Sequence, residues 1–280
     1  LSNILSSIPN SAVIFEPLQL NHVPEAKTVG FNWRTYKDFN ENWLEGKEFL
    51  EKVFQKKIIN KWILRDSSER DITRAKWLIV KSVRANRLLP WMSNNLDLRK
   101  PPILLIRHPC AVVSSQLLSK SDWKNNKQPN PPSYIQNYPN FLLSLSSTNT
   151  LEEYLAAEWC LDQLPPLLYL KNTSMIIITY EELLLRPFTI LETIKKKWGI
   201  NISKKRFIKI HGKPSSMTWK SGISGLEGWR RKLNSTQINN ILKVVNRFGL
   251  EFYNENLEAN YNKLYNDSLD KNIKNIGNSL

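Results

Sequence analysis

Short apolar runs, each closed by a polar residue, recur along the chain and predict buried β-strands. They are short, rich in β-branched residues and bounded by turn-forming or charged positions, which is typical of strands covered on both faces. A weaker run near residues 61–64 fits either a helix or a loop. The four clear runs occupy residues 12–15, 77–80, 103–106 and 175–179, and the residues that follow them are Glu16, Lys81, Arg107 and Tyr180.

Between these runs, apolar residues recur at intervals of three and four, which predicts helices. Strands that alternate with helices predict an α/β fold, with a central, mainly parallel sheet flanked by helices. Polar residues at the carboxyl ends of parallel strands gather at one edge of a sheet, so that edge is the candidate site. The predicted helices cover residues 49–60, 85–92, 111–118, 151–161, 189–198 and 236–248.

The organisation of the chain predicts one domain over residues 1–253. Within it, residues 121–150 are rich in Asn, Pro and Ser and predict a long loop or lid, which its aromatic residues would pack against the domain. Residues 254–280 are polar and rich in Asn, so we expect a C-terminal tail in which a helix frays to disorder. The sequence opens on an apolar helical face without a cap or an initiator Met, and we expect that an upstream segment is missing.

Composition narrows the class of protein. The chain has 280 residues, of which 41% are hydrophobic, enough for a sizeable core, and no apolar run reaches membrane-spanning length. The net charge of +15 favours an anionic partner such as a nucleotide, an acidic glycan, nucleic acid or an anionic membrane, although the basic residues are dispersed. Two distant cysteines and three histidines without metal-ligand spacing argue against a disulfide scaffold and a metal site.

Arg107 and Ser115 form the first candidate pair. An arginine directly after a strand and a hydroxyl eight residues further on, in the next helix, can converge on one phosphate. The run RHPCAVVSS resembles the Arg-x-Pro-x-Ala-Val-x-x-Ser pattern of the sulfotransferases that use 3′-phosphoadenosine 5′-phosphosulfate (PAPS). The resemblance implies that Arg107 and Ser115 hold the 3′-phosphate of PAPS. The alternative is a helix entered through a proline turn, with Arg107 solvated.

Glu16 and Lys81 are the candidate catalytic residues. Pro17 predicts an extended Glu16 at the end of its strand, where a carboxylate can take a proton from a hydroxyl. The stretches FEPL and KSVR resemble segments of carbohydrate-type sulfotransferases, which implies Glu16 as the base and Lys81 as a cation that faces either the acceptor or the sulfonate. Glu16 could instead cap a helix or pair with a lysine, and Lys81 could simply extend into solvent.

Two further stretches resemble nucleotide-binding segments of the same family. The run YEEL from Tyr180 resembles a Tyr-Glu-Asp-Leu segment, which implies that Tyr180 lies near the adenine, although a core tyrosine fits as well. The glycine-containing stretch 219–237 resembles a C-terminal loop that closes over the 3′-phosphate, with extra residues before its second tryptophan. That likeness implies Lys220, Ser221 and Gly222 as further nucleotide-binding residues.

These landmarks follow the family's order over residues 12–237, whereas its Gly-x-x-Arg-Ser-Gly-Thr-Thr phosphosulfate loop does not occur in the sequence. The resemblance therefore implies a P-loop NTPase-like sulfotransferase fold that lacks its first strand and phosphate loop. The implied activity is transfer of a sulfonate from the co-substrate PAPS to a hydroxyl, which we expect to belong to a glycan. The implied reaction requires no metal. If residue 1 is the true start, we expect weak nucleotide binding and little catalysis.

Two other classes stay open. A P-loop kinase-like phosphotransferase would need a Walker Gly-Lys-Ser/Thr, which the sequence lacks. A basic nucleic-acid-binding module would fit the net charge and the tryptophans interleaved with lysines, but no recognition motif occurs, so we expect no nucleic-acid partner. The few cysteines favour a cytoplasmic protein, or a Golgi enzyme if an N-terminal anchor has been lost.

Overall fold

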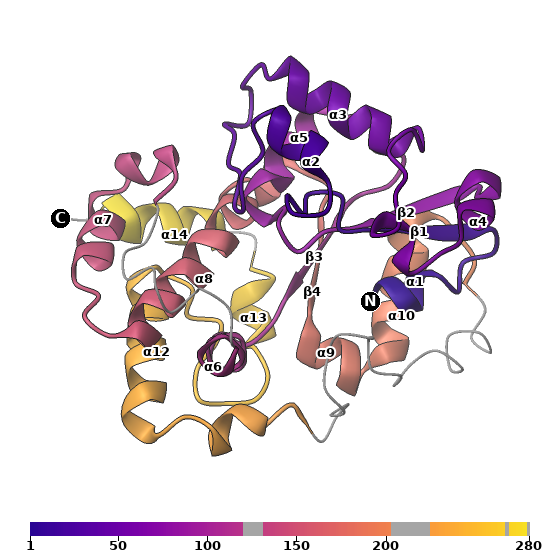
Figure 1. Cartoon of the computed structure of the whole chain (residues 1–280). Helices are drawn as coiled ribbons and strands as arrows, with labels where there is room; N and C mark the ends of the chain where they lie inside the picture. The colour runs from indigo at the N-terminus through magenta and orange to yellow at the C-terminus, as the bar shows by residue number, and fades with distance from the viewer. Residues whose placement is uncertain (120–130, 203–224, 267–268, 279–280) are drawn as a thin grey trace. The chain divides into compact units, whose positions relative to one another are not determined.

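The structure is a computed structural model that describes residues 1–119, 131–202, 225–266 and 269–278 (Figure 1). Its contacts group into two compact units, where the sequence predicts a single domain over residues 1–253. The first unit is Leu1–Pro102 with Pro187–Ser216, and the second is Ile103–Arg186 with Met217–Leu280. Each unit is described by itself below.

A pair of parallel strands lies at the centre of the first unit. β1 (Ser11–Phe15) runs parallel to β2 (Trp77–Lys81), in a register that places Phe15 opposite Lys81. β1 is almost wholly buried, as its unbroken apolar run predicts. α4 (Glu69–Arg74) and the short 3₁₀ turn η1 (Ile63–Arg65) contact β1, so the weak run near residues 61–64 is helical in part.

Several of the remaining helices of the first unit bury apolar residues in one core. α3 (Leu44–Phe54) buries Phe49, Leu50 and Val53, and it ends before Lys56, whose φ of 64° lies in the left-handed region. The core also holds the fully buried Trp91. The other helical elements are α1 (Ser2–Leu5), α2 (Pro24–Thr28), η2 (Asn86–Leu88), α5 (Leu89–Asn95) and α10 (Pro187–Trp198).

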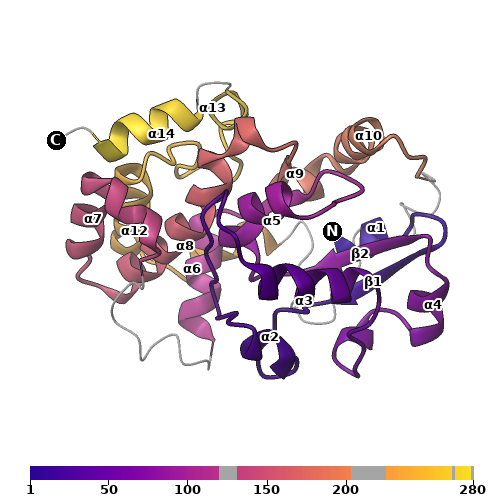
Figure 2. The same cartoon turned by 90° about the horizontal axis from the view of Figure 1, so that it is seen from above.

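The second unit also contains one parallel strand pair, β3 (Ile103–Ile106) with β4 (Ile176–Thr179). Its core is largely helical: α6 (Pro109–Leu118), α8 (Leu151–Leu168) and α12 (Ser235–Arg247) contact one another, as Figure 2 shows. The smaller elements of this unit are η4 (Ser133–Asn137), α7 (Pro139–Ser146), η5 (Leu170–Asn172), α9 (Tyr180–Leu185), η7 (Gly228–Arg231), α13 (Tyr261–Leu264) and α14 (Leu269–Asn278).

The α/β class is therefore confirmed, and all four predicted strands form at the predicted places. The described residues hold two separate two-stranded parallel sheets, however, rather than one central sheet. Parallel strands need long crossover connections, and in both pairs these connections contain helices. No helix of the described segments is both long enough and apolar enough to cross a membrane.

Two segments are more ordered than the sequence predicts. The described part of the expected loop, residues 131–150, contains η4 and α7, and its Tyr134 and Phe141 are buried as expected of a packed excursion. The expected C-terminal tail contains α13 and α14, which bury Leu264, Leu269 and Ile273. Apolar side chains at intervals of four give α14 a buried face, so the tail is helical over residues 269–278.

Candidate functional site

Glu16 directly follows β1 and has an unusual backbone conformation. Its φ is 45°, in the left-handed region that non-glycine residues rarely adopt, so the expected extended conformation is wrong. The Glu16 N–H donates to the Lys81 carbonyl at 2.8 Å, and the Glu16 carbonyl accepts from Trp62 Nε1 at 3.3 Å. These bonds hold a strained backbone at a strand end, a combination that is frequent at functional sites.

The Glu16 carboxylate is buried, with 3% of the residue exposed, and it lies between two cations. Its Oε1 is 3.2 Å from Lys81 Nζ. Its Oε2 is 3.5 Å from Arg84 Nη1 and accepts from the Val83 N–H at 3.0 Å. The first unit thus brings the two candidate catalytic residues, Glu16 and Lys81, into direct contact and adds Arg84, which no sequence argument had singled out as catalytic.

Aromatic rings flank this cluster. Lys81 Nζ lies 4.1 Å from the centroid of the Phe15 ring, and the Arg84 guanidinium lies 4.9 Å from that of Trp33, which is 44% exposed. Burial lowers the pKa of Arg84, while the neighbouring Glu16 raises it. Chemically, the cluster offers one proton acceptor and two cations that can stabilise negative charge.

Arg107, in the second unit, directly follows β3. Its carbonyl accepts a hydrogen bond from Trp159 Nε1 at 3.1 Å, which fixes the backbone where the side chain begins. The guanidinium carbon lies 4.9 Å from the centroid of the Tyr180 ring. Its Nε is buried and has no hydrogen-bond partner in the part of the chain that the structure describes. A buried donor without a partner is costly, so it marks a position where a ligand could supply an acceptor.

Tyr180 is the first residue of α9, so the structure brings two of the predicted nucleotide-binding residues, Arg107 and Tyr180, into contact. Ser115 lies in the second turn of α6 and is exposed. No hydrogen bond between described residues joins its hydroxyl to Arg107, so their convergence on one phosphate stays a prediction. Lys220, Ser221 and Gly222 lie outside the described residues.

His108, between Arg107 and the helix, has a structural role that the sequence analysis did not identify. It is completely buried and caps α6, because its Nδ1 accepts from the Cys110 N–H at 3.2 Å. Nε2 therefore carries the proton and donates to the Asn254 carbonyl at 2.9 Å. Burial lowers the pKa of His108 to about 4, so the ring is neutral at physiological pH.

The buried carboxylate of Glu181 also bonds to the backbone of His108. The His108 N–H donates to Glu181 Oε1 at 3.0 Å, and the Tyr253 hydroxyl donates to Glu181 Oε2 at 2.8 Å. The Trp229 ring stacks on His108 with centroids 4.7 Å apart. Burial raises the pKa of Glu181, an effect that the two hydrogen bonds oppose. A histidine before a proline that opens a helix was the sequence signal available for this cap.

The described residues offer no obvious metal centre. They contain no group of three or more His, Cys, Asp or Glu side chains that could hold a metal ion. Cys110 and Cys160 are both buried and free. Burial raises the pKa of the Cys110 thiol to about 12 and that of Cys160 well above its ordinary value, which makes both thiols poor nucleophiles.

Comparison of the chain with protein-family models, with curated proteins and with solved structures gives no match. The functional interpretation therefore depends on the chain's own residues. Two clusters carry it, and they belong to different units: Glu16 with Lys81 and Arg84 in the first, and Arg107 with Tyr180 in the second.

Proposed function

We propose that this chain transfers a sulfonate from PAPS to a hydroxyl group of a carbohydrate. The observation that carries the proposal is the environment of the Arg107 guanidinium. Its guanidinium carbon lies over the Tyr180 ring, 4.9 Å from the centroid, and its buried Nε has no hydrogen-bond partner among the described residues. A guanidinium in contact with a ring keeps N–H groups as donors, which suits a phosphate with several acceptor oxygens.

Within each unit, the candidate residues lie where parallel strands end, which supports the proposal. Glu16 directly follows β1 and Lys81 is the last residue of β2, whereas Arg107 and Tyr180 directly follow β3 and β4. Ligands of parallel α/β sheets bind beyond the carboxyl ends of the strands. We include in the proposal a P-loop NTPase-like fold and a place for Tyr180 beside the adenine.

The proposed chemistry at Glu16 is an in-line displacement at sulfur. The acceptor hydroxyl oxygen forms a bond to the sulfur of the donor substrate, and the bond between sulfur and the bridging phosphate oxygen breaks. The hydroxyl proton passes to the Glu16 carboxylate, and adenosine 3′,5′-bisphosphate leaves. Lys81 and Arg84, which lie 3.2 and 3.5 Å from Glu16, are the cations available to stabilise negative charge on the transferred group.

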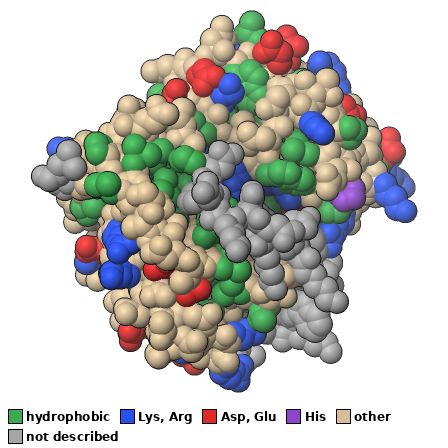
Figure 3. Space-filling model, turned by 60° about the vertical axis from the view of Figure 1, so that its left-hand side comes forward, with side chains coloured by type: hydrophobic (Ala, Val, Ile, Leu, Met, Phe, Trp, Pro, Cys, Tyr) green, Lys and Arg blue, Asp and Glu red, His purple; other side chains and the backbone are tan. Residues whose placement is uncertain are grey.

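The net charge of +15 is compatible with an anionic donor substrate. On the face drawn in Figure 3, the lysines and arginines among the described residues stand in small groups, with acidic and apolar side chains between them. A nucleic-acid-binding surface would instead gather its cations into a patch or stripe.

Thermal unfolding with two nucleotides tests the proposal. Adenosine 3′,5′-bisphosphate should raise the Tm of the wild type more than adenosine 5′-monophosphate at equal concentration, because only the former carries the phosphate assigned to Arg107. In Arg107→Ala the difference between the two nucleotides should disappear. Equal shifts by both nucleotides in the wild type would contradict the assignment.

Arg247→Ala is the matched control. This substitution also removes one guanidinium from the second unit, but that guanidinium already bonds to Ser147 Oγ at 2.8 Å. Both variants lower the net charge equally, so a general electrostatic effect on nucleotide binding would weaken both. The proposal requires that Arg247→Ala keep the full preference for the bisphosphate.

A further inference from the structure

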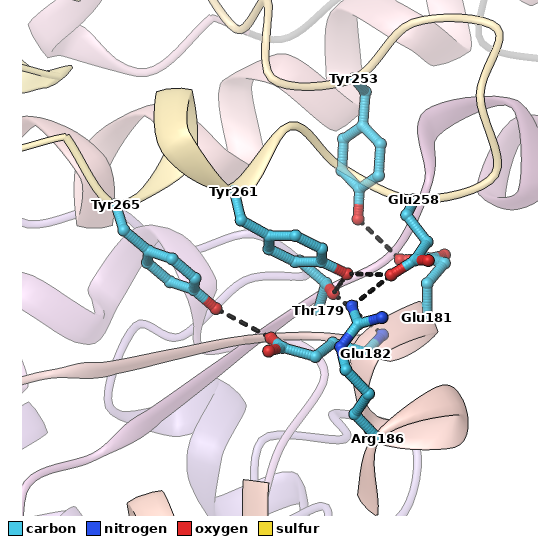
Figure 4. Close-up of polar contacts among 8 residues, drawn as sticks. All are labelled: Thr179, Glu181, Glu182, Arg186, Tyr253, Glu258, Tyr261 and Tyr265. Atoms are coloured by element: carbon cyan, nitrogen blue, oxygen red, sulfur yellow. Dashed lines mark hydrogen bonds and ion pairs between the residues drawn. The ribbon is translucent and has the colours of Figure 1, made fainter. Parts of the chain in front are cut away.

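A cavity in the second unit is lined by residues that the proposed sulfonate transfer does not use. It has a volume of about 560 Å³ and opens between α9 and the segment of residues 254–265. Its lining combines two phenol rings, two carboxylates and one guanidinium, which Figure 4 draws, with three side-chain amides. The volume lies within the range of small-molecule sites. The sequence analysis gave no sign of this cavity, because it assigned the lining residues from 254 onward to a tail.

Tyr261 and Tyr265 form the aromatic wall of this cavity. Their rings are nearly parallel, at an interplanar angle of 17° with centroids 6.0 Å apart, and Tyr265 is 47% exposed. The Tyr265 hydroxyl donates to Glu182 Oε2, and that of Tyr261 donates to Glu258 Oε2, each at 3.0 Å. Figure 4 shows both rings extending from α13 toward these carboxylates. The hydroxyl bonds fix the rings in place before any ligand arrives.

The charges of the lining disfavour an anionic ligand, and one of its tyrosine rings is already occupied by a cation. Glu182 and Glu258 outnumber the one cation, Arg186, whose guanidinium is already paired with Glu258, so an anion would meet net repulsion. A cationic ligand would compete with Arg186 for the Tyr261 ring, from whose centroid the guanidinium lies 5.1 Å. A neutral ligand with many hydroxyl groups is not repelled by the carboxylates and does not compete with Arg186.

The amides complete the match to such a ligand. The side-chain oxygens of Asn254 and Asn260 accept from backbone N–H groups of Asn256 and Lys263, at 2.7 and 3.1 Å. Their NH₂ groups remain as donors at the cavity, while the carboxylates of the lining are acceptors. A sugar hydroxyl needs both, since it donates one hydrogen bond and accepts others.

We propose that this cavity is a binding site for a neutral saccharide ring. The apolar face of the sugar lies on the exposed Tyr265 ring, its hydroxyls donate to Glu182 and Glu258, and it accepts from the Asn254 and Asn260 amides. This inference does not rest on sulfonate transfer. Glu182 follows Tyr180 by two residues, about 200° around the helix axis, so the saccharide and the proposed nucleotide use different sides of α9.

Saturation-transfer NMR with a panel of neutral methyl glycosides tests the proposal. The panel contains glucoside, galactoside, mannoside, xyloside, fucoside and N-acetylglucosaminide, and a glucuronide serves as the anionic probe. The full chain should transfer saturation to the ring protons of at least one neutral glycoside. Tyr265→Ala should weaken that binding by about tenfold, whereas Tyr265→Phe should keep most of it, because the ring remains.

Tyr36→Ala is the matched control, since the Tyr36 hydroxyl also donates to a carboxylate, Asp38 Oδ1 at 2.6 Å, but in the first unit. It should bind glycosides as the wild type does. Absence of transfer to every neutral probe, a preference for the glucuronide, or binding unchanged in Tyr265→Ala would each overturn the proposal. The Tm shift with adenosine 3′,5′-bisphosphate should be unchanged in both Tyr265 variants, so failure of this site and failure of the nucleotide site are distinguishable.

Discussion

At the scale of single residues, the chemistry available to a side chain depends on which of its polar atoms already have a partner. Arg107 keeps a buried Nε without a partner in the described segments, whereas both oxygens of Glu16 contact a cation. The Arg107 Nε can therefore still donate to a ligand, whereas the Glu16 carboxylate is already paired with Lys81 and Arg84. The order of the residues along the chain predicted their positions, but it could not predict which polar atoms would be left unpaired, because that depends on tertiary packing.

Glu16→Gln should destabilise the protein. The substitution keeps the shape of the side chain but removes the charge that faces Lys81 and Arg84, at 3.2 and 3.5 Å. Because both cations are partly exposed, we expect a loss of about 2 kcal/mol in the free energy of unfolding, less than for a fully buried pair. Chemical denaturation measures it, with the exposed Glu48→Gln as control, which should change stability by less than about 0.5 kcal/mol. A loss no larger than the control's would refute the paired state of Glu16.

The two thiols should be unreactive in the native protein. Cys110 and Cys160 are buried, and burial raises the pKa of Cys110 to about 12 and that of Cys160 well above its ordinary value. Reaction with Ellman's reagent at pH 8 should therefore be slow for the folded chain and complete, at both cysteines, in guanidinium chloride. Rapid labelling of the native protein would show that one of the two sites opens easily.

At the scale of elements, α8 shows how a side chain distant in the sequence can stabilise a helix that contains two prolines. The helix was expected to end at residue 161 but continues to Leu168 through Pro165 and Pro166. Pro165 has no N–H to donate to the Leu161 carbonyl, one turn earlier. The Tyr134 hydroxyl donates to that carbonyl instead, at 3.2 Å, so η4 supplies the bond that the proline removes.

Tyr134→Phe tests this compensation. It leaves the Leu161 carbonyl without that hydrogen bond in a buried setting, and it should cost about 1–2 kcal/mol of stability by chemical denaturation. Tyr138→Phe is the control in the same segment, since no hydrogen bond between described residues involves its hydroxyl. Similar effects of the two substitutions would argue against the bond from Tyr134 to α8.

The strands were predictable because each is a compact apolar run, and the observed bounds differ from the expected ones by no more than a residue at either end. The missed elements are those whose apolar residues are sparse. α14 lies in a polar segment, and only the spacing of Leu269 and Ile273 marks its buried face. Its Gly277 packs so closely on α7 that an added Cβ would lie 2.6 Å from the Tyr138 ring, a contact that no local pattern encodes.

At the scale of the whole molecule, sequence reasoning predicted the α/β class but not how the strands pair. Residues 103–106 and 77–80 were expected in one sheet, and the structure assigns them to separate parallel pairs. Strand periodicity specifies which faces are buried, but pairing depends on the whole chain. The residues at the strand ends were predictable because each ends or follows an apolar run, and they are Glu16, Lys81, Arg107 and Tyr180. The cavity beside α9 was not predictable from such runs.

Stability should depend on pH through His108. Burial lowers its pKa from 6.5 to about 4, so between these values the unfolded chain binds a proton that the folded protein does not. The free energy of unfolding should therefore decrease as the pH falls from about 6.5 to 4, by about 3 kcal/mol from this group. The raised pKa of Glu181 acts in the opposite sense, because its contribution is largest at low pH and is lost as the pH rises.

His108→Asn isolates the histidine, because asparagine can still cap α6 and does not titrate. Glu181 is common to both proteins, so the difference in stability between wild type and variant should shrink as the pH falls from 6.5 to 4. Denaturation curves at several pH values measure this difference. A constant difference would mean that His108 is not buried in its neutral form.

The most direct measurement of the central claim is ³¹P NMR of adenosine 3′,5′-bisphosphate, whose two phosphates give separate signals. We predict that titration with the protein shifts and broadens the 3′-phosphate signal, and that Arg107→Ala abolishes this change while Arg247→Ala preserves it. A response confined to the 5′-phosphate, or a 3′-phosphate response that persists in Arg107→Ala, would contradict the assignment of Arg107 to the nucleotide.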